Sequence, residues 1–226
     1  MEDIMIKLKN INKRYSDNII FDDFNIDFYI DEINCILGKS GCGKSTLLNI
    51  ISGIIENDSR NFDAIDYLGI SYIFQEDRLI DWLTVEENIK LVVEDVYDKR
   101  NIDNMCNKYL NLVGMSQYKK YYPQMLSGGL RQRVNIARAF IYPSKIIIMD
   151  EPFKSIDIKN KQMIMDSLLE IQNEEKRTIL FVTHDIDEAL FLGDKIYILG
   201  NYPVKIKGVL DNVGELLDKR KIFELI

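Results

Sequence analysis

The sequence predicts an α/β fold with a mainly parallel core sheet, an N-terminal antiparallel β-subdomain and a helical subdomain. Three observations support this prediction. Short, fully apolar runs such as 146–149 alternate with helical patterns, as in a parallel sheet covered by helices. Residues 4–30 alternate polar and apolar side chains, which is typical of antiparallel strands. The stretch of roughly 84–142 contains helical patterns only.

The composition limits the classes of function. The chain has 226 residues, of which 46% are hydrophobic, and a formal net charge of −7, which argues against a nucleic-acid-binding surface. Its three cysteines are odd in number and match no metal-site spacing, so we expect a reducing, cytosolic setting. The N-terminus lacks a signal-peptide pattern, and no apolar run is long enough to span a bilayer. A membrane role would therefore require a partner.

The alternating segment predicts two strands joined by a turn at 16–18. Ile6 and Leu8 share one face of the first strand, and Phe24 and Phe28 share one face of the second. Tyr15 stands just before the turn, where the pattern alone favours a half-buried strand aromatic over a ligand contact. Residues 53–70 have no clear period and allow no prediction.

A glycine-rich loop follows the apolar run 33–37 and opens a helix over 45–51. It fits the phosphate-binding pattern G-x-x-x-x-G-K-[ST] at every fixed position and comprises Gly38, Lys39, Ser40, Gly41, Cys42, Gly43, Lys44, Ser45 and Thr46. The glycines let the backbone N–H groups converge on one anion. Lys44 would contact the outer phosphates, and the Ser45 hydroxyl would bind Mg²⁺. The loop predicts a P-loop NTPase.

The helical stretch has three predicted helices. Residues 84–87 form a capping box, followed by an apolar stripe of Val85, Ile89, Val92, Val93 and Val96. A second helix places Ile102, Met105, Cys106, Tyr109 and Val113 on one face and stops at Gly114. The third begins at Ser127, Gly128 and Gly129 and buries Val134, Ala137 and Ile141. Its start is either a second anion site or a plain serine cap with flexible glycines.

Polar residues follow several of the predicted strands. Gln75 follows 70–74, Asp150 and Glu151 follow 146–149, and His184, the single histidine, follows 178–182. Adjacent carboxylates at a strand end suit a division of labour, in which Asp150 holds Mg²⁺ and Glu151 accepts a proton from water. The alternative is a pair of solvated surface acids.

The remaining C-terminal half adds further elements. A helix carries Ile164, Leu168 and Ile171, and 174–177 is expected to be a solvated loop. Asp185 caps a short helix, and 196–199 is another strand. The last twenty-odd residues predict a short strand and a terminal amphipathic helix.

Several segments together resemble the ATP-binding-cassette (ABC) ATPases over essentially the whole chain. Residues 126–133 resemble the family's signature, and they lie upstream of the Asp150–Glu151 strand as in that family. The resemblance extends to the phosphate loop, the glutamine loop at Gln75, the D-loop at 155–157 and the switch-histidine loop at 183–185. It implies a single ABC ATPase domain over 1–226, with its core at roughly 1–83 and 143–226 and a helical subdomain at roughly 84–142.

The resemblance also implies roles for individual residues. ATP would lie between 38–46 of one chain and Ser127, Gly128 and Gly129 of a second copy, in a homodimer that forms with ATP bound. Glu151 would be the general base, and His184 would contact the γ-phosphate. Gln75 would touch Mg²⁺ or the attacking water, and Asp157 would lie at the dimer seam. Tyr15 would stack on adenine, which replaces the interpretation drawn from its pattern alone.

A finer resemblance points to the nitrate/sulfonate/taurine importer subfamily. It rests on 74–89 and 150–155. It implies an energy-coupling ATPase subunit, peripheral on the inner face of the cell membrane, whose permease docks near Gln75 to Leu83, with a separate extracytoplasmic substrate-binding protein. Trp82 would line the docking groove, or would instead pack under the helical lobe. The alternatives are an exporter or lipoprotein-release ATPase, or a soluble ABC ATPase acting on nucleic acid.

Overall fold

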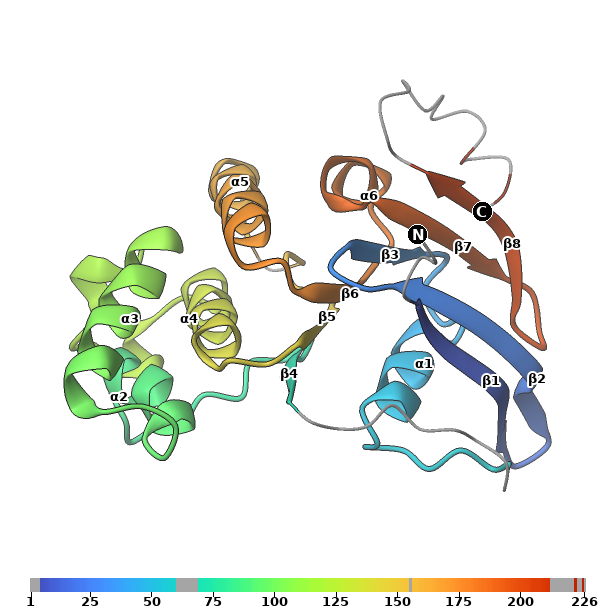
Figure 1. Cartoon of the computed structure of the whole chain (residues 1–226), viewed down its shortest axis with the longest axis horizontal. Helices are drawn as coiled ribbons and strands as arrows, with labels where there is room; N and C mark the ends of the chain where they lie inside the picture. Colours follow the sequence, from blue (N-terminus) through green and yellow to red (C-terminus); the bar gives the residue numbers. More distant parts are fainter. Residues whose placement is uncertain (1–4, 60–68, 155, 212–221, 223–224, 226) are drawn as a thin grey trace. The chain divides into compact units, whose positions relative to one another are not determined.

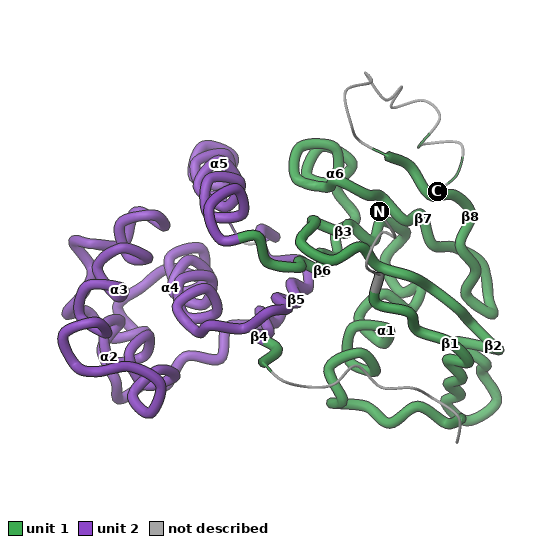
Figure 2. Tube along the Cα trace, in the orientation of Figure 1, with its two compact units in different colours: residues 1–70, 176–226 green, residues 71–175 purple. Residues whose placement is uncertain are grey.

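The computed structural model describes residues 5–59, 69–154, 156–211, 222 and 225. Two compact units make up the chain: unit 1 comprises 1–70 and 176–226, and unit 2 comprises 71–175 (Figure 2). Each unit is described separately below.

Unit 1 begins with the predicted antiparallel pair. Strand β1 (Met5–Tyr15) pairs with β2 (Asn18–Tyr29), and the turn lies between Tyr15 and Asn18. Leu8, Phe24 and Phe28 are buried, which confirms the alternation that predicted these strands. The two strands form a sheet of their own.

The second sheet of unit 1 is built around β3 (Ile33–Leu37), whose five residues are all buried. It pairs in parallel with both β6 (Thr178–Thr183) and β7 (Lys195–Gly200). Strand β8 (Lys205–Asp211) adds to β7 in the antiparallel direction. Helices α1 (Lys44–Ile51) and α6 (Ile186–Leu192) lie on opposite sides of these strands (Figure 1). The parallel pairing agrees with the predicted fold class.

The described residues of unit 2 form two neighbouring strands, β4 (Ile70–Ile73, whose first residue belongs to unit 1) and β5 (Ile146–Asp150), and four α-helices. The helices are α2 (Val85–Lys90), α3 (Lys99–Leu112), α4 (Gly128–Ile141) and α5 (Ile158–Glu175). Helices α2, α3 and α4 pack on one another. The predicted core residues Val134, Ala137 and Ile141 of α4 are buried, as are Ile102, Cys106 and Tyr109 of α3.

Two sequence-based predictions in unit 2 are wrong. Helix α2 ends at Lys90 and continues as a 3₁₀ turn, Leu91–Val93, so the apolar stripe loses its phase. Val92 and Val96 are therefore exposed, whereas Val93 is buried. The predicted loop 174–177 is also too long, because α5 continues to Glu175. The Tyr109 hydroxyl donates to the Glu175 carboxylate at 2.7 Å, and this contact holds the last turn.

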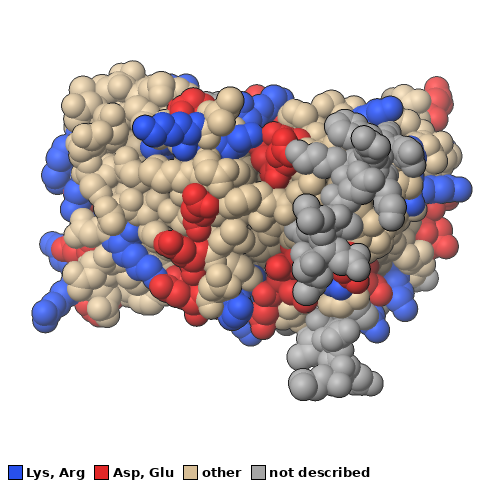
Figure 3. All heavy atoms as spheres, turned by 90° about the horizontal axis from the view of Figure 1, so that it is seen from above, with Lys and Arg blue, Asp and Glu red and all other residues tan. Residues whose placement is uncertain are grey.

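Strand β8 matches the short strand predicted near the C-terminus, whereas the predicted terminal helix lies outside the described residues. All three cysteines are free and buried. In the described part of the chain no helix is both long and apolar enough to cross a membrane. On the face shown in Figure 3, basic and acidic side chains are interspersed among other residues.

Candidate functional site

The phosphate loop connects β3 to α1 within unit 1. Gly41 and Gly43 have φ angles of +81° and +98°. Glycine adopts this region without strain, whereas residues with a side chain are strained there. A Cβ atom on Gly38 would come within 2.7 Å of the Leu199 carbonyl oxygen, so only glycine fits there. Gly43 is also the N-cap of α1. The loop therefore has the backbone conformation that the motif predicts, with the N-terminus of α1 at its end.

Lys44 lies in the first turn of α1 and is 4% exposed. Its ammonium donates to the carbonyl oxygens of Gly38 at 2.7 Å and Lys39 at 2.9 Å. Both acceptors belong to the loop itself, so the charge is held at the centre of the loop. Ser45 follows it and is partly exposed. This arrangement presents a cation, a hydroxyl and helical N–H groups to an anion.

Tyr15 closes β1 and pairs with Asn18 across the turn. Its side chain is 44% exposed, and the Lys13 ammonium lies 5.7 Å from the ring centroid. The exposed ring can stack on a planar ligand. Stacking on adenine stays a prediction.

His184 follows β6, and its loop is fixed by its neighbours. The Thr183 hydroxyl donates to the Glu188 carboxylate at 2.6 Å and accepts from the Asp185 N–H at 3.0 Å. Asp185 in turn caps α6, as predicted, by accepting from the N–H groups of Asp187 and Glu188. His184 is exposed at the tip of this loop. A rigid loop thus carries a solvent-accessible imidazole.

In unit 2, Gln75 lies two residues after β4 and is exposed. The ring of the preceding Phe74 contacts two side chains: Tyr72 stacks on it with 4.1 Å between the ring centroids, and the Arg78 guanidinium lies 3.6 Å from its centroid. Arg138 of α4 donates to the Arg78 carbonyl at 2.7 Å. The residues around Gln75 are therefore anchored to α4, while the glutamine side chain is accessible.

Asp150 is the last residue of β5 and is 6% exposed. Burial, together with the charge of Asp150, raises the pKa of Tyr72. Glu151 has a φ angle of +46°, a left-handed conformation that costs a non-glycine residue on the order of 1 kcal/mol. Its carboxylate forms an ion pair with Lys154 at 3.2 Å. Asp150 is buried and the Glu151 side chain is only 11% exposed, so the alternative that the pair consists of solvated surface acids is wrong.

Ser127 is the N-cap of α4, and its side chain accepts from the Leu130 N–H at 3.4 Å. The serine cap is therefore present. Ser127 and Gly128 are both exposed, and a Cβ atom on Gly128 would meet nothing within 4 Å. The start of this helix leaves room for another molecule.

Asp157 lies just before α5, where it accepts from the backbone N–H of Asn160 at 3.1 Å and from its side chain at 2.5 Å. These bonds lower the pKa of the exposed carboxylate. Ser155, its neighbour in the predicted D-loop, lies outside the described residues.

Trp82 is 78% exposed, so the alternative that it packs under the helical lobe is wrong. Sequence reasoning missed the residue that shapes its loop. Asn88 of α2 is fully buried; it accepts from the Ile80 N–H at 2.7 Å and donates to the carbonyls of Ile80, Leu83 and Thr84 at 3.0 to 3.1 Å. An asparagine in a helical pattern gives no sequence signal for such a role, since this residue type is usually exposed.

The predicted site residues fall into two groups. Tyr15, the phosphate loop (38–46) and His184 belong to unit 1, whereas unit 2 holds Gln75, Ser127, Gly128, Gly129, Asp150, Glu151 and Asp157. Among the described residues, no three His, Cys, Asp or Glu side chains gather as a metal site. The serine hydroxyl, glutamine amide and aspartate carboxylate proposed for Mg²⁺ offer oxygen donors. Mg²⁺ usually binds only a few oxygen atoms of the protein and takes its other ligands from phosphates and water.

Comparisons with known proteins agree with these features. The family model for ABC transporters matches residues 21–154. An aliphatic sulfonates import ATP-binding protein, SsuB 1, from Pseudomonas savastanoi pv. phaseolicola is 36% identical over 203 residues, covering 90% of this chain and 84% of the relative. The aliphatic sulfonates import ATP-binding protein SsuB from Bacillus subtilis is 37% identical over 214 residues, covering 90% of this chain and 81% of the relative.

Solved structures show the same fold. The dimeric post-hydrolysis state of the ATP-binding cassette MJ0796 bound to ADP and phosphate has a TM-score of 0.80 and 28% identity, covering 94% of this chain and all of that one. A second dimeric structure of MJ0796, described as a bacterial ABC transporter cassette, has a TM-score of 0.81. The family match spans more than half of the chain, and the curated relatives align along most of their length. This chain belongs to the ABC transporter family, as an ATP-binding subunit.

Proposed function

We propose that this chain is the ATP-hydrolysing, energy-coupling subunit of an importer for aliphatic sulfonates or a related small solute. The observation that carries the ATPase assignment is the phosphate loop, with Gly41 and Gly43 in left-handed conformations and buried Lys44 at its centre. The names of the relatives support an importer, and two of those relatives share 36% and 37% identity with this chain over nine-tenths of its length.

The proposed chemistry is hydrolysis of the terminal phosphate by water. Lys44 and the N–H groups of the loop bind the phosphates, and Tyr15 stacks on the base. Glu151 takes the proton from the attacking water, and His184 contacts the γ-phosphate. Ser45, Gln75 and Asp150 would hold Mg²⁺, which would neutralise phosphate charge.

The site is completed by a second copy of this chain. Ser127, Gly128 and Gly129 present an exposed, unobstructed helix start, which suits the phosphates of a nucleotide held by the other copy. Asp157 lies at the seam. MJ0796 forms dimers in both solved structures, which supports this assembly.

Permease subunits dock on the segment from Gln75 to Leu83, whose Trp82 is exposed. Transport then follows from closure of the dimer on ATP and its reopening after hydrolysis. A separate extracytoplasmic binding protein delivers the solute, and the chain works on the cytoplasmic face of the membrane. These assignments rest on the relatives and on the motifs.

Two measurements test the proposal. The purified chain hydrolyses Mg·ATP, and Lys44→Ala loses nucleotide binding while its unfolding midpoint stays near that of the wild type. Cells that lack this chain lose uptake of a labelled alkanesulfonate, and a plasmid copy restores it. Unchanged ATP binding by Lys44→Ala would overturn the phosphate-loop assignment. Unchanged alkanesulfonate uptake, with loss of nitrate uptake instead, would replace the sulfonate assignment.

A further inference from the structure

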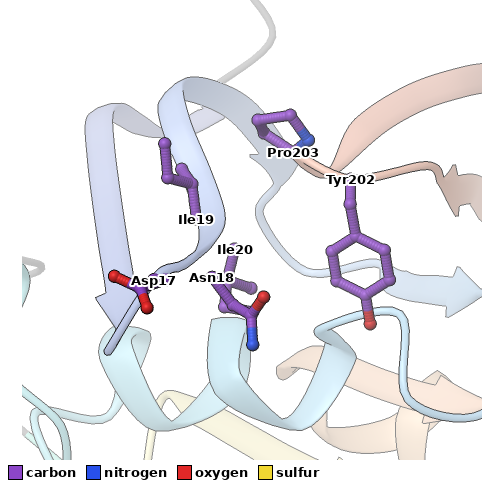
Figure 4. Close-up of a pocket in the computed structure, with 6 residues that line it drawn as sticks. All are labelled: Asp17, Asn18, Ile19, Ile20, Tyr202 and Pro203. Atoms are coloured by element: carbon purple, nitrogen blue, oxygen red, sulfur yellow. The ribbon is translucent and has the colours of Figure 1, made fainter.

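A pocket of about 510 Å³ lies in unit 1 beside the phosphate loop (Figure 4). One wall is the start of β2 and the turn before it, and the other is the turn between β7 and β8. The lining residues are Asp17, Asn18, Ile19, Ile20, Tyr202 and Pro203. The volume lies within the range of sites for drug-sized ligands.

Both walls of the pocket contact the phosphate loop. The Tyr202 hydroxyl donates to the Gly41 carbonyl at the tip of the loop. The Val204 N–H donates to the Ile20 carbonyl at 2.8 Å, which joins the two walls. A Cβ atom on Gly43 would come within 3.0 Å of Val204 and 3.1 Å of Ile20. The pocket therefore lies directly beside the phosphate loop.

The chemistry of the lining suits the nucleoside end of a nucleotide. When its phosphates lie in the loop, the ribose and base must extend away from it, and this pocket is adjacent. Tyr202 is 60% exposed, so its ring is available for stacking, and Ile19 and Ile20 add apolar surface. Asp17 and Asn18 supply hydrogen-bonding groups for ribose or base. Tyr15, on which the base is proposed to stack, pairs with Asn18 in the same hairpin.

We propose that Tyr202 is a nucleotide-binding residue with two separable roles. Its ring forms a wall against the nucleoside, and its hydroxyl holds the peptide that follows Gly41. That peptide's N–H, on Cys42, donates to the Lys39 carbonyl at 3.2 Å, so both of its polar groups are fixed. The phosphate loop is thereby ordered before the nucleotide arrives. The inference rests on the proposed nucleotide site at the phosphate loop.

Two variants separate the roles when ATP and inorganic tripolyphosphate are compared as ligands with Mg²⁺ by calorimetry. Tyr202→Phe loses only the hydroxyl, and its Kd rises about threefold to tenfold for both ligands. Tyr202→Ala also loses the ring, so its Kd for ATP rises by about a further tenfold, with no further change for tripolyphosphate. The thermal unfolding midpoint of Tyr202→Phe falls by no more than about 2–4 °C, as expected for the loss of one hydrogen bond in a chain of this size, so the change in Kd does not come from unfolding.

Tyr122→Ala removes a comparably exposed tyrosine from unit 2, and it leaves both Kd values unchanged. Wild-type affinity for ATP in both Tyr202 variants would overturn the proposal. Equal effects of Tyr202→Phe and Tyr202→Ala on ATP would overturn the role of the ring. If Lys44→Ala loses ATP while the Tyr202 variants bind normally, only this inference fails. If the wild-type chain does not bind ATP, the proposed nucleotide site fails as well.

Discussion

Arg131 of the signature helix and Asp77 of the segment after Gln75 form an ion pair, with 2.8 Å between the arginine Nε and the aspartate Oδ2 atoms. The same guanidinium donates to the Leu126 carbonyl at 3.1 Å, just before the cap of α4. Arg131 thus connects the proposed permease-docking segment to the start of the signature helix within unit 2. A substitution at either residue is therefore expected to affect the segment that carries the other.

Loss of this ion pair is expected to loosen the docking segment. Asp77→Asn and Arg131→Met each increase hydrogen exchange of the 76–79 amides severalfold, since side chains about one-third exposed form pairs worth roughly 1 kcal/mol. The double variant Asp77→Arg with Arg131→Asp restores protection of these amides, because the ion pair forms again with the two charges swapped. Glu76→Gln, which changes an exposed neighbouring acid, serves as the control and has no effect. Exchange in the doubly substituted chain as fast as in the single variants would contradict the coupling.

Asn88 is expected to be the main support of the Trp82 loop. Asn88→Ala removes the side-chain partner of the Ile80 N–H and of the Leu83 carbonyl and leaves a cavity at a fully buried position, so the free energy of unfolding falls by about 2–4 kcal/mol. Guanidinium chloride titration measures this loss. Asn104→Ala, on the exposed face of α3, changes stability by less than about 0.5 kcal/mol. Equal stability of the two variants would show that the Asn88 contacts are not essential.

Glu86, on helix α2 of unit 2, makes the free energy of unfolding depend on pH. Burial raises its pKa, but hydrogen bonds from Lys90, Lys120 and Lys119 outweigh burial and lower the pKa from 4.5 to about 2. Because the folded-state pKa lies below the unfolded value, the carboxylate stabilises the fold above pH 4.5, and this contribution is lost as the pH falls towards 2.

The comparison of wild type with Glu86→Gln isolates this contribution. At pH 7 the free energy of unfolding of the variant is lower than that of the wild type by at most about 3 kcal/mol. This difference shrinks as the pH falls from 4.5 to 2. Denaturant titrations across this range provide the measurement. Glu94→Gln, at an exposed position of the same region, provides the control. A difference that stays constant with pH would rule out the lysine cluster as its source.

Glu151→Gln tests the proposed general base. Glutamine keeps the size of the side chain but cannot accept the proton, so ATP hydrolysis falls at least about 100-fold. ATP remains bound, and light scattering after size exclusion detects an ATP-dependent dimer. The exposed acid Glu170 on α5 is the matched control, and Glu170→Gln keeps wild-type hydrolysis. Hydrolysis by Glu151→Gln at the wild-type rate would disprove the assignment.

Trp82→Ala tests the docking surface. A tryptophan that is 78% exposed contributes little to folding, but it can dominate a protein interface. The variant is expected to lose most of the permease that co-purifies with the tagged wild-type chain from membranes. Phe191→Ala, which removes a 39%-exposed aromatic side chain from α6 in unit 1, retains the permease. Undiminished co-purification with Trp82→Ala would place the interface elsewhere.

The strands, most of the helices and the phosphate loop could be predicted from local sequence patterns. These are local features: a fully apolar run becomes a buried strand, and residues 38–46 carry their own backbone geometry through Gly41 and Gly43. The capping box at Thr84 and Glu87 was predictable for the same reason, because its two partners lie three residues apart.

The side chains that hold these elements in place could be identified from the three-dimensional contacts alone. Arg131 and Asp77 are 54 positions apart, and Tyr202 and Gly41 are 161 apart, so no local pattern records either contact. The end of α2 at Lys90 also depends on packing, because the apolar pattern alone would continue the helix through Val96. Short-range periodicity encodes elements, whereas contacts between distant residues depend on how the whole chain packs.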